Sequence, residues 1–500
     1  MTLQHPWKKA PVLNYLHQIQ LSKRLLLILL FGLAIIPNIG CTAKTSFSNL
    51  QSLVILNNKV IAQTPPKAAP QEIVQPGEVR ALPGKLDTIP VFNSNSPEWI
   101  KTEGILLSTF PTTGKKTPDA HLNFPLVGRY DLFAHHYTHT PKDLQTLYIG
   151  VMLYNPGNKP VTVDVLQGAS YLMVDAPFVT LPPYIENNDG KVFSGPGSRA
   201  VADVLRGVRQ KDFPAKLVIS PKQSRMVLNH PIPVRGLSKP VNGRSSFMRL
   251  QSSGKIYAAS LAMFAKKNTD GSDRAPTLVE WENLLSNGNF AGPRDKTPTV
   301  PDAAGGKLIY GRVAGVSQGS RLSATLADSA TSKSPLLTIP QPGKAISYGI
   351  VTLRGGRLGT EQNQTAKMLV RYPDTAYEAH GNYGVGYNLS LPLSNNTSKT
   401  QVATVTLETP LKEDKLSKGG LRFRNPSLDF PFFRGTVRVK YIDDQGKQVN
   451  RYVHLWHRTG QVLEPLVKLT MPANTRRQVQ VDLIYPPDST PPHVLTVRTL

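Results

Sequence analysis

Residues 147–166, LYIGVMLYNPGNKPVTVDVL, decide the fold class of this chain. The first run, Leu147–Tyr154, is apolar and rich in residues that favour strands, and the turn-forming residues 155–158 (NPGN) follow it directly. The second run, Val161–Leu166, has valine at every second position, which is the period of a half-buried strand. Two short runs of this kind on either side of a turn predict two β-strands.

Runs of the same kind recur through the rest of the chain, each bounded by Gly, Pro, Asn or Asp. Short strands at this spacing are typical of sandwiches, so the sequence predicts an all-β fold with two β-sandwich or jelly-roll-like domains. Residues 443–446 (DDQG) are predicted to form a hairpin loop, with Gly446 free to take a positive φ. The further predicted strands are Lys216–Ser220, Arg225–Asn229, Phe247–Leu250, Ile256–Phe264, Leu308–Val313, Ala345–Leu353, Lys367–Arg371, Tyr387–Leu393, Gln401–Thr409, Gly435–Ile442, Gln448–His457, Val462–Leu469, Gln478–Ile484 and Val494–Val497.

One short helix is predicted between the two β domains, near residues 277–287. Thr277 and Glu280 have the spacing of a capping box, and Gly288 can end the helix. Leu278, Trp281, Leu284 and Leu285 lie on one helical face. A Pro- and Gly-rich segment follows, so we place a domain boundary near residue 300. The predicted divisions are a signal peptide and leader (1–62), a proline-rich extended lead-in (63–100), β domain 1 with the helix (101–300) and β domain 2 (301–500).

The N-terminal segment has the pattern of an export signal. The basic pair Lys23-Arg24 precedes twelve uninterrupted apolar residues, Leu25–Ile36. This core is shorter than the roughly 20 residues that a permanent membrane helix needs, and no later stretch approaches that length. The sequence therefore predicts export, with no second membrane anchor.

Three cleavage points compete. Cleavage after Gly40 would resemble lipoprotein processing and would make Cys41, the only cysteine, the lipidated N-terminus, although Asn38 and Ile39 depart from the usual motif. Ordinary cleavage after Ala43 or after Ala62 also fits the small residues there. Every outcome leaves the mature protein without a usable thiol, which excludes disulfides, thiol catalysis and cysteine zinc sites.

The charge of the chain favours an anionic partner. The formal net charge is +25, and residues 1–71 contain seven Lys or Arg and no Asp or Glu, which leaves +18 on residues 72–500. A positive surface attracts polyanions, and outside the cytoplasm these include acidic polysaccharide and other envelope components. No basic run with interleaved aromatic residues indicates nucleic-acid binding. Membrane contact is expected only through the signal peptide or a lipid anchor on Cys41.

Residues 131–139 (DLFAHHYTH) contain the best metal-ligand candidates: Asp131, His135, His136 and His139, with His121 nearby. His135 and His139 have the spacing at which one helix face presents two ligands to one ion. The neighbouring residues are poor helix formers, and in a strand residues four apart are separated by ~13 Å, too far to share an ion. The cluster is therefore either a metal site or a set of hydrogen-bonding side chains on a strand.

Two other motifs are weaker. Residues 381–386 (GNYGVG) resemble a phosphate loop but lack its Lys-Ser/Thr pair, so we predict a tight turn that leads into the strand Tyr387–Leu393. Residues 186–190 (ENNDG) fall short of an EF-hand loop and are predicted to form a polar turn. No catalytic or cofactor-binding residue is assigned, and no cofactor is expected.

Eight segments after residue 68 are similar to a known family. They are Pro70–Pro76, Val91–Pro97, Thr102–Pro111, Asp131–His136, Ala275–Leu278, Ala291–Asp295, Tyr372–Tyr377 and Phe433–Val437. Together they resemble the cyanobacterial domain of unknown function family 3370. The resemblance implies an exported cyanobacterial protein of unassigned activity, and it transfers no catalytic residue.

The sequence thus predicts an exported protein of the periplasm, the outer-membrane surface or the extracellular space. Its expected role is structural or binding rather than enzymatic, with acidic glycan or another envelope component as partner. The alternative is a metal-dependent or carbohydrate-active enzyme that uses the His121–His139 region.

Overall fold

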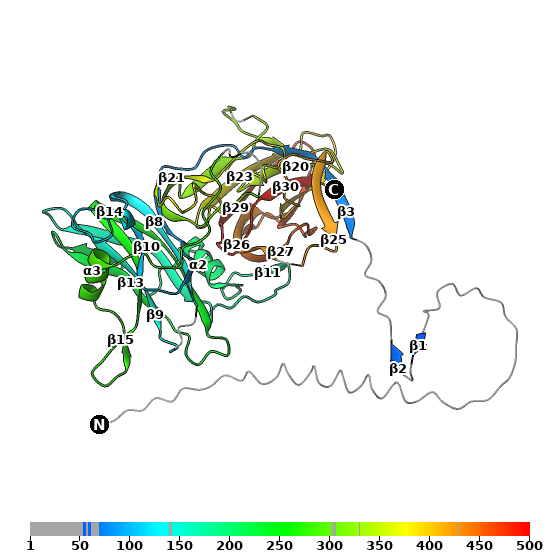
Figure 1. Ribbon diagram of the computed structural model, residues 1–500. Helices are drawn as coiled ribbons and strands as arrows, with labels where there is room; N and C mark the ends of the chain where they lie inside the picture. Colours follow the sequence, from blue (N-terminus) through cyan, green and yellow to red (C-terminus); the bar gives the residue numbers. More distant parts are fainter. Residues whose placement is uncertain are drawn as a thin grey trace, which may run out of the picture. The chain divides into compact units, whose positions relative to one another are not determined.

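The computed structural model describes residues 54–56, 59–61, 70–139, 143–301, 303, 307–329, 331–429 and 431–500 (Figure 1). The chain divides into two units, residues 1–68 and 69–500, and we call the second unit the body. In the first unit, β1 (Val54–Leu56) pairs with β2 (Lys59–Ile61) as an antiparallel hairpin. The predicted signal core Leu25–Ile36, Cys41 and the cleavage points after Gly40, Ala43 and Ala62 lie outside the described residues.

The regular structure of the body is almost entirely β, which confirms the all-β prediction. Among the described residues, no helix has the length and apolar character needed to cross a membrane. The largest sheet has twelve strands. They are β5 (Pro90–Ser94), β6 (Trp99–Ile100), β7 (Gly104–Ser108), β8 (Leu126–His139), β9 (Leu147–Tyr154), β10 (Val161–Leu172), β12 (Lys216–Ile219), β13 (Ser224–Ile232), β14 (Val241–Phe264), β17 (Ala314–Gln318), β21 (Ala366–Arg371) and β22 (Glu378–Ala379).

The 24-residue strand β14 organises this sheet. Its first part pairs with β8 and β10, and after an irregularity between Ser252 and Ile256 its second part pairs with β7 and β9. The predicted strands Phe247–Leu250 and Ile256–Phe264 are therefore parts of one strand, in which Gln251 and Ser252 still pair and residues 253–255 form the irregularity. Consecutive strands β9 and β10 do not pair with each other, since each finds its partners across β14 or in β13 and β12.

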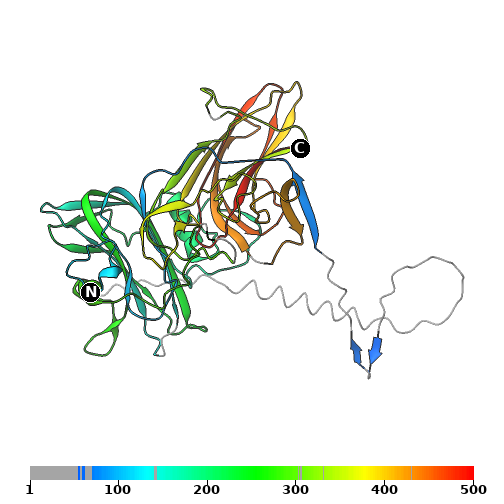
Figure 2. The ribbon, with the colours of Figure 1, turned by 45° about the horizontal axis from the view of Figure 1, so that its top comes forward.

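Two further sheets form the C-terminal part of the body, and Figures 1 and 2 draw most of their strands in yellow-green to red. Together they enclose one hydrophobic core, to which Leu389 and Val481 contribute from one sheet and Val405 and Val497 from the other. The first has seven strands: β11 (Tyr184–Glu186), β18 (Arg321–Thr325), β19 (Leu337–Thr338), β23 (Gly386–Ser394), β26 (Pro431–Ile442), β27 (Gln448–Arg458) and β29 (Arg476–Ile484). The second has five: β4 (Glu78–Arg80), β20 (Ala345–Ile350), β24 (Gln401–Glu408), β28 (Val467–Met471) and β30 (His493–Thr499).

Short elements complete the body. The pair β3 (Gln71–Pro76) and β25 (Gly420–Asn425) and the pair β15 (Lys266–Lys267) and β16 (Asp273–Arg274) are separate two-stranded ladders, and a 3₁₀ turn covers Pro118–Ala120. Strands are exchanged across the predicted boundary near residue 300. β17 and β21 extend the twelve-stranded sheet, whereas β4 and β11 join the C-terminal sheets. The division into two sandwich domains stays a prediction.

The predicted helix is confirmed as α3 (Leu278–Asn287), including its capping box. The Thr277 side chain accepts from the Glu280 N–H, and the Glu280 carboxylate accepts from the Thr277 N–H at 2.7 Å. Trp281 and Leu285 are buried, as the predicted face requires. Gly288 ends the helix in an extended conformation rather than a left-handed one.

A second helix, α2 (Pro196–Leu205), is not predicted by the sequence. Its first residues, Pro196 and Gly197, are typical of a turn, which hides the helical period of the apolar residues that follow. Val201 and Val204 are buried against Phe247 of the twelve-stranded sheet and Ile484 of the seven-stranded sheet. α2 therefore packs between these two sheets, as Figure 1 shows.

Three predicted strands are wrong in whole or in part. Ala345–Leu353 ends early, at Ile350, as β20. Leu308–Val313 is not a strand. It forms no strand ladder, and its Ile309 carbonyl instead accepts from the Thr299 N–H at 2.8 Å. β28 begins only at Val467, since Pro465 lacks the N–H that a ladder needs. The hairpin loop at residues 443–446 is confirmed: β26 pairs with β27 across it, and Gly446 has φ 79°.

The packing of α2 gives a prediction about stability. Val204 is 2% exposed. Val204→Ala should lower the free energy of unfolding by about 1–3 kcal/mol, because removal of the two methyl groups leaves a cavity between two sheets. Val279 on α3 is 72% exposed, so Val279→Ala is the matched control and should change stability by less than about 0.5 kcal/mol. Urea unfolding of both variants measures the difference, and equal losses would contradict the assigned packing of α2.

Candidate functional site

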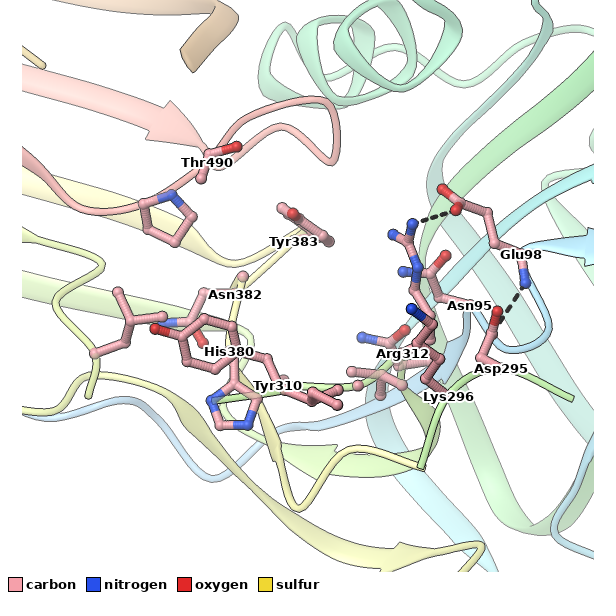
Figure 3. A pocket seen from close by; sticks show the side chains of 18 of the residues that line it. Asn95, Glu98, Asp295, Lys296, Tyr310, Arg312, His380, Asn382, Tyr383 and Thr490 are labelled. Atoms are coloured by element: carbon pink, nitrogen blue, oxygen red, sulfur yellow. Dashed lines mark hydrogen bonds and ion pairs between the residues drawn. The ribbon is translucent and has the colours of Figure 1, made fainter. Parts of the chain in front are cut away.

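A pocket of about 550 Å³ lies in the body where the twelve-stranded sheet meets the C-terminal sheets, and we call it the central pocket (Figure 3). Loops at the ends of strands form most of its lining. They are residues 95–98 between β5 and β6 with the adjoining Trp99, residues 295–296 and 309–313 before β17, residues 380–383 between β22 and β23 with the adjoining Ala379, and residues 490–491 before β30. Loops held by a rigid sheet scaffold are the usual place for a binding site.

Figure 3 shows side chains on two sides of an open centre. Asn95, Glu98 and Arg312 lie on one side, and Tyr310, His380 and Asn382 lie on the other. The first wall belongs to the end of the twelve-stranded sheet. The second wall includes the turn that leads into β23, so the predicted tight turn at residues 381–386 is confirmed, and it borders the central pocket.

Both carboxylates of the central pocket are already engaged by protein groups. Glu98 forms an ion pair with Arg312, and its other oxygen lies 3.7 Å from His135 Nε2. Burial opposes the ionisation of Glu98, but His135 and the Arg312 guanidinium together lower its pKa below the ordinary value. Asp295 Oδ2 accepts from Ser96 Oγ at 2.8 Å and from the Glu98 N–H at 3.2 Å.

Two lysines of the central pocket have no such partner. In the described part of the chain, no carboxylate lies within ion-pair distance of Lys296 or Lys412. Lys412 is half-buried and donates to Tyr310 Oη at 2.8 Å. Burial lowers the pKa of Lys412, since its ammonium group is partly removed from water. An anionic ligand in the central pocket would offset this desolvation.

Two buried carboxamides also face the central pocket. Asn93 and Asn95 are each 3% exposed, and within the described residues neither Oδ1 atom has a hydrogen-bond donor. A buried acceptor left without a donor costs about 1–3 kcal/mol. Ligand hydroxyl or amine groups that donate to these oxygens would recover that free energy.

Aromatic rings complete the lining. Tyr310 packs against His380 with ring centroids 4.9 Å apart, and burial raises the pKa of Tyr310 to about 12, so its hydroxyl stays protonated. Tyr383 donates to the Ser489 carbonyl at 3.0 Å. Trp99 lies at the mouth of the central pocket and is 39% exposed. The central pocket therefore combines flat apolar rings with donors and acceptors.

The structure places the metal-ligand candidate His136 behind the first wall rather than in it. His136 Nδ1 lies 2.8 Å from the Pro97 carbonyl, and Nε2 lies 2.9 Å from Ser94 Oγ. A carbonyl only accepts, so Nδ1 carries the proton and Nε2 accepts from Ser94. His136 thereby fixes the loop that presents Asn95 and Glu98 to the central pocket.

The other candidates do not converge on one point. His135 bonds Ser245 Oγ at 2.7 Å and faces Glu98, whereas Asp131 accepts from Arg129 at 3.3 Å and lies 3.7 Å from Arg249 Nε. His121 bonds Ser108 Oγ at 2.8 Å and does not line the central pocket. His139 is the last residue of β8, and its side chain lies outside the described part. Among the described residues, no group of three or more His, Cys, Asp or Glu side chains could hold a metal ion.

The body matches a family model described as "Protein of unknown function (DUF3370)" over residues 77–499. The chain belongs to the DUF3370 family. No curated protein matches this DUF3370 protein in sequence. Two segments on which the resemblance rests, Val91–Pro97 and Ala291–Asp295, supply Asn93, Asn95 and Asp295 to the central pocket of the DUF3370 protein.

Sequence reasoning missed the residues of the central pocket, because they come from loops far apart in the chain. No local spacing joins Glu98 to Arg312 or Asn95 to Lys412. One signal was present: Trp99 is one of only four tryptophans, and it follows the polar segment 93–98 (NSNSPE) directly. The glycine-rich segment 381–386 was recognised as a turn but not as part of a site.

The buried histidines predict acid sensitivity. Burial lowers the pKa of His136 to about 4, so the folded protein keeps it neutral while the unfolded chain protonates it below its usual pKa of about 6.5. The contribution of neutral His136 to the free energy of unfolding is therefore complete above pH 6.5 and is lost as pH falls toward 4. On acidification from pH 7.5 to pH 5, this histidine alone should lower the free energy of unfolding by about 2 kcal/mol. Burial gives His121, His230 and His454 a similar pKa of about 4 and His457 a pKa of about 3.

Urea unfolding at the two pH values, with His136→Gln as the comparison, measures this contribution. An amide keeps one donor and one acceptor for Pro97 and Ser94, so the loss on acidification should be smaller by about 2 kcal/mol in the variant. Burial raises the pKa of Asp131 to about 6, which acts in the opposite direction but equally in both proteins. Identical pH dependence of wild type and variant would show that His136 is not a neutral buried group.

Proposed function

We propose that this DUF3370 protein is exported to the cell envelope of a cyanobacterium, where its central pocket binds an acidic sugar unit of an envelope glycan. The observation on which the proposal depends is that one pocket holds two buried carboxamide oxygens without a hydrogen-bond donor and two ammonium groups without a carboxylate partner, among the described residues. Asn93 and Asn95 supply the oxygens, and Lys296 and Lys412 supply the ammonium groups.

An acidic sugar matches this set of groups by its own chemistry. Its hydroxyls donate hydrogen bonds that the Asn93 and Asn95 oxygens accept. Its carboxylate accepts from ammonium groups, and such charge-assisted bonds are about twice as strong as neutral ones. Because Arg312 neutralises Glu98, the two lysines outnumber Asp295, the one carboxylate of the described lining that has no cation partner.

The aromatic residues support a sugar over a simple anion. Sugar rings have apolar C–H faces, which pack on aromatic rings as other apolar groups do. Trp99 and Tyr310 present such rings at two places on the lining. A pocket for an inorganic anion would need the cations but not these apolar surfaces.

The state of Glu98 supports binding rather than glycoside hydrolysis. A general acid for that reaction needs a raised pKa so that it holds a proton near neutral pH. Glu98 has a lowered pKa and forms an ion pair with Arg312, so it is ionised and occupied. Glu98 instead orients the Arg312 side chain within the pocket wall.

The export part of the proposal is supported by the N-terminal pattern and by charge. The segment Lys23–Ile36 has the basic and apolar parts of a signal peptide. The +18 charge of residues 72–500 attracts anionic polymers, and envelope polysaccharides are the abundant anionic polymers outside the cytoplasm.

Binding of galacturonate by isothermal titration calorimetry tests the pocket. Galacturonate should bind at least about tenfold more tightly than galactose, because only the acid accepts from Lys412 and Lys296. Lys412→Gln should weaken galacturonate binding by about tenfold and leave galactose unaffected. Affinity for galacturonate should also fall as salt is added.

Lys447 provides the matched control, since it is an exposed lysine in the hairpin turn between β26 and β27 and does not line the central pocket. Lys447→Gln removes the same charge and should leave both affinities unchanged. Equal affinity for the acid and the neutral sugar, or equal losses in the two lysine variants, would contradict recognition by the central pocket.

Mass spectrometry of the native N-terminus tests export. Removal of the signal should leave a chain that begins at residue 41 with a lipid on Cys41, at residue 44 or at residue 63. The lipid form would indicate a membrane-anchored protein and the other two a protein released from the membrane. An intact N-terminus at Met1 in the cytoplasmic fraction would overturn the export proposal.

A further inference from the structure

A second hollow adjoins the central pocket, with a volume of about 420 Å³. The two share Trp99 and Asp295 in their linings, so they adjoin each other at these residues. We call the second hollow the outer pocket. It is lined by Trp99, Lys101, Val241, Pro293, Arg294 and Asp295.

Trp99 is held rigidly between the two pockets by a stack across three strands. Trp99 on β6 is the ladder partner of Tyr137 on β8, and their ring centroids lie 5.0 Å apart with 30° between the planes. Tyr137 is in turn the partner of Gly243 on β14. The Tyr137 ring covers Gly243 so closely that a Cβ at residue 243 would lie 2.2 Å from Cδ1. The indole is therefore a fixed platform, although it is 39% exposed.

The outer pocket, like the central pocket, contains a lysine without a carboxylate partner. Lys101 is exposed, and no carboxylate in the described ranges lies within ion-pair distance of it. Arg294 is held by a bidentate ion pair with Asp374, at 2.7 and 2.9 Å, and its guanidinium lies over the Phe290 ring. Lys101 is thus the ammonium group that remains for an anion in the outer pocket, beside the Asp295 carboxylate that both pockets share.

We infer that the ligand is a chain of at least two acidic sugar units that runs from the central pocket across Trp99 into the outer pocket. This inference rests on the proposed function and specifies its ligand. One unit bonds Asn93, Asn95 and Lys412 in the central pocket. The chain packs on the indole of Trp99, and the carboxylate of a further unit accepts from Lys101.

A chain gains from both pockets at once. After the first unit is bound, the second meets the outer pocket at an effective concentration set by the glycosidic link, which is in the millimolar range or above. Even a weak second contact then raises the affinity of the whole chain. A single sugar unit gains nothing from the outer pocket, so chain length separates the two contributions.

Calorimetric titration of the full mature protein with galacturonate and with trigalacturonate tests the inference. Trigalacturonate should bind at least about tenfold more tightly than galacturonate. Lys101→Gln should remove most of this gain while leaving the affinity for galacturonate unchanged, because Lys101 lines only the outer pocket. Trp99→Ala should lower the affinity for trigalacturonate more than the affinity for galacturonate, because the indole lines both pockets. Trp99→Phe keeps a ring at the platform and should retain part of the gain.

A positioning variant separates the platform from a general loss of apolar surface. Gly243→Ala keeps Trp99 but displaces the Tyr137 ring beneath it, so it should reduce the chain-length gain although the indole is still present. Thermal unfolding of each variant verifies that the body is folded. Val279→Ala, on the exposed face of α3, should behave as wild type with both ligands.

The outcomes distinguish the inference from the proposed function. Equal affinity for the single unit and the trimer, or a gain that survives Trp99→Ala and Lys101→Gln, would overturn the chain across Trp99 and leave the central pocket intact. Failure of both ligands to bind would overturn the proposed function and the inference with it.

Discussion

The backbone hydrogen bonds of β14 are the constraint on which the rest of the body depends. A buried strand must pair its N–H and C=O groups, and β14 does so with four strands in succession. Its pairing with β8 sets Tyr137 over Gly243 and turns His136 toward the Pro97 carbonyl. β8 then pairs in parallel with β5 and β6, which fixes both ends of the loop that lines the central pocket.

The central pocket is where this rigid sheet meets the C-terminal sheets, and α2 packs between them nearby. In regular strands the backbone N–H and C=O groups are paired by the neighbouring strands. The loops that join the strands bring side chains of both charges into a half-buried space. Glu98 and Arg312 neutralise each other there, whereas Lys412 and the Asn93 and Asn95 oxygens do not find equivalent partners among the described residues. Polar groups left in this condition are costly to folding and are typical of sites that bind a ligand.

The histidines illustrate how one sequence signal can point to the right region for a different reason. Their clustering suggested a metal site, and the structure shows two of them on β8 directly behind the pocket wall. Neighbouring residues on a strand face opposite sides of the sheet, so His135 meets Ser245 and Glu98 while His136 meets Ser94 and Pro97. Their role in the described structure is to position the wall.

The sequence by itself determined the local features: the all-β class, most strand positions, the capping box of α3, the hairpin at residues 443–446 and the resemblance to DUF3370. Each depends on residues close together in the chain, whose propensities and period suffice. Only the tertiary structure decided the continuity of β14, the helix α2 and the central pocket. α2 is stabilised by Phe247 and Ile484, and the pocket joins residues from Asn93 to Pro491. Contacts over such separations leave no period in the sequence, because the partners are chosen by the packing of whole sheets.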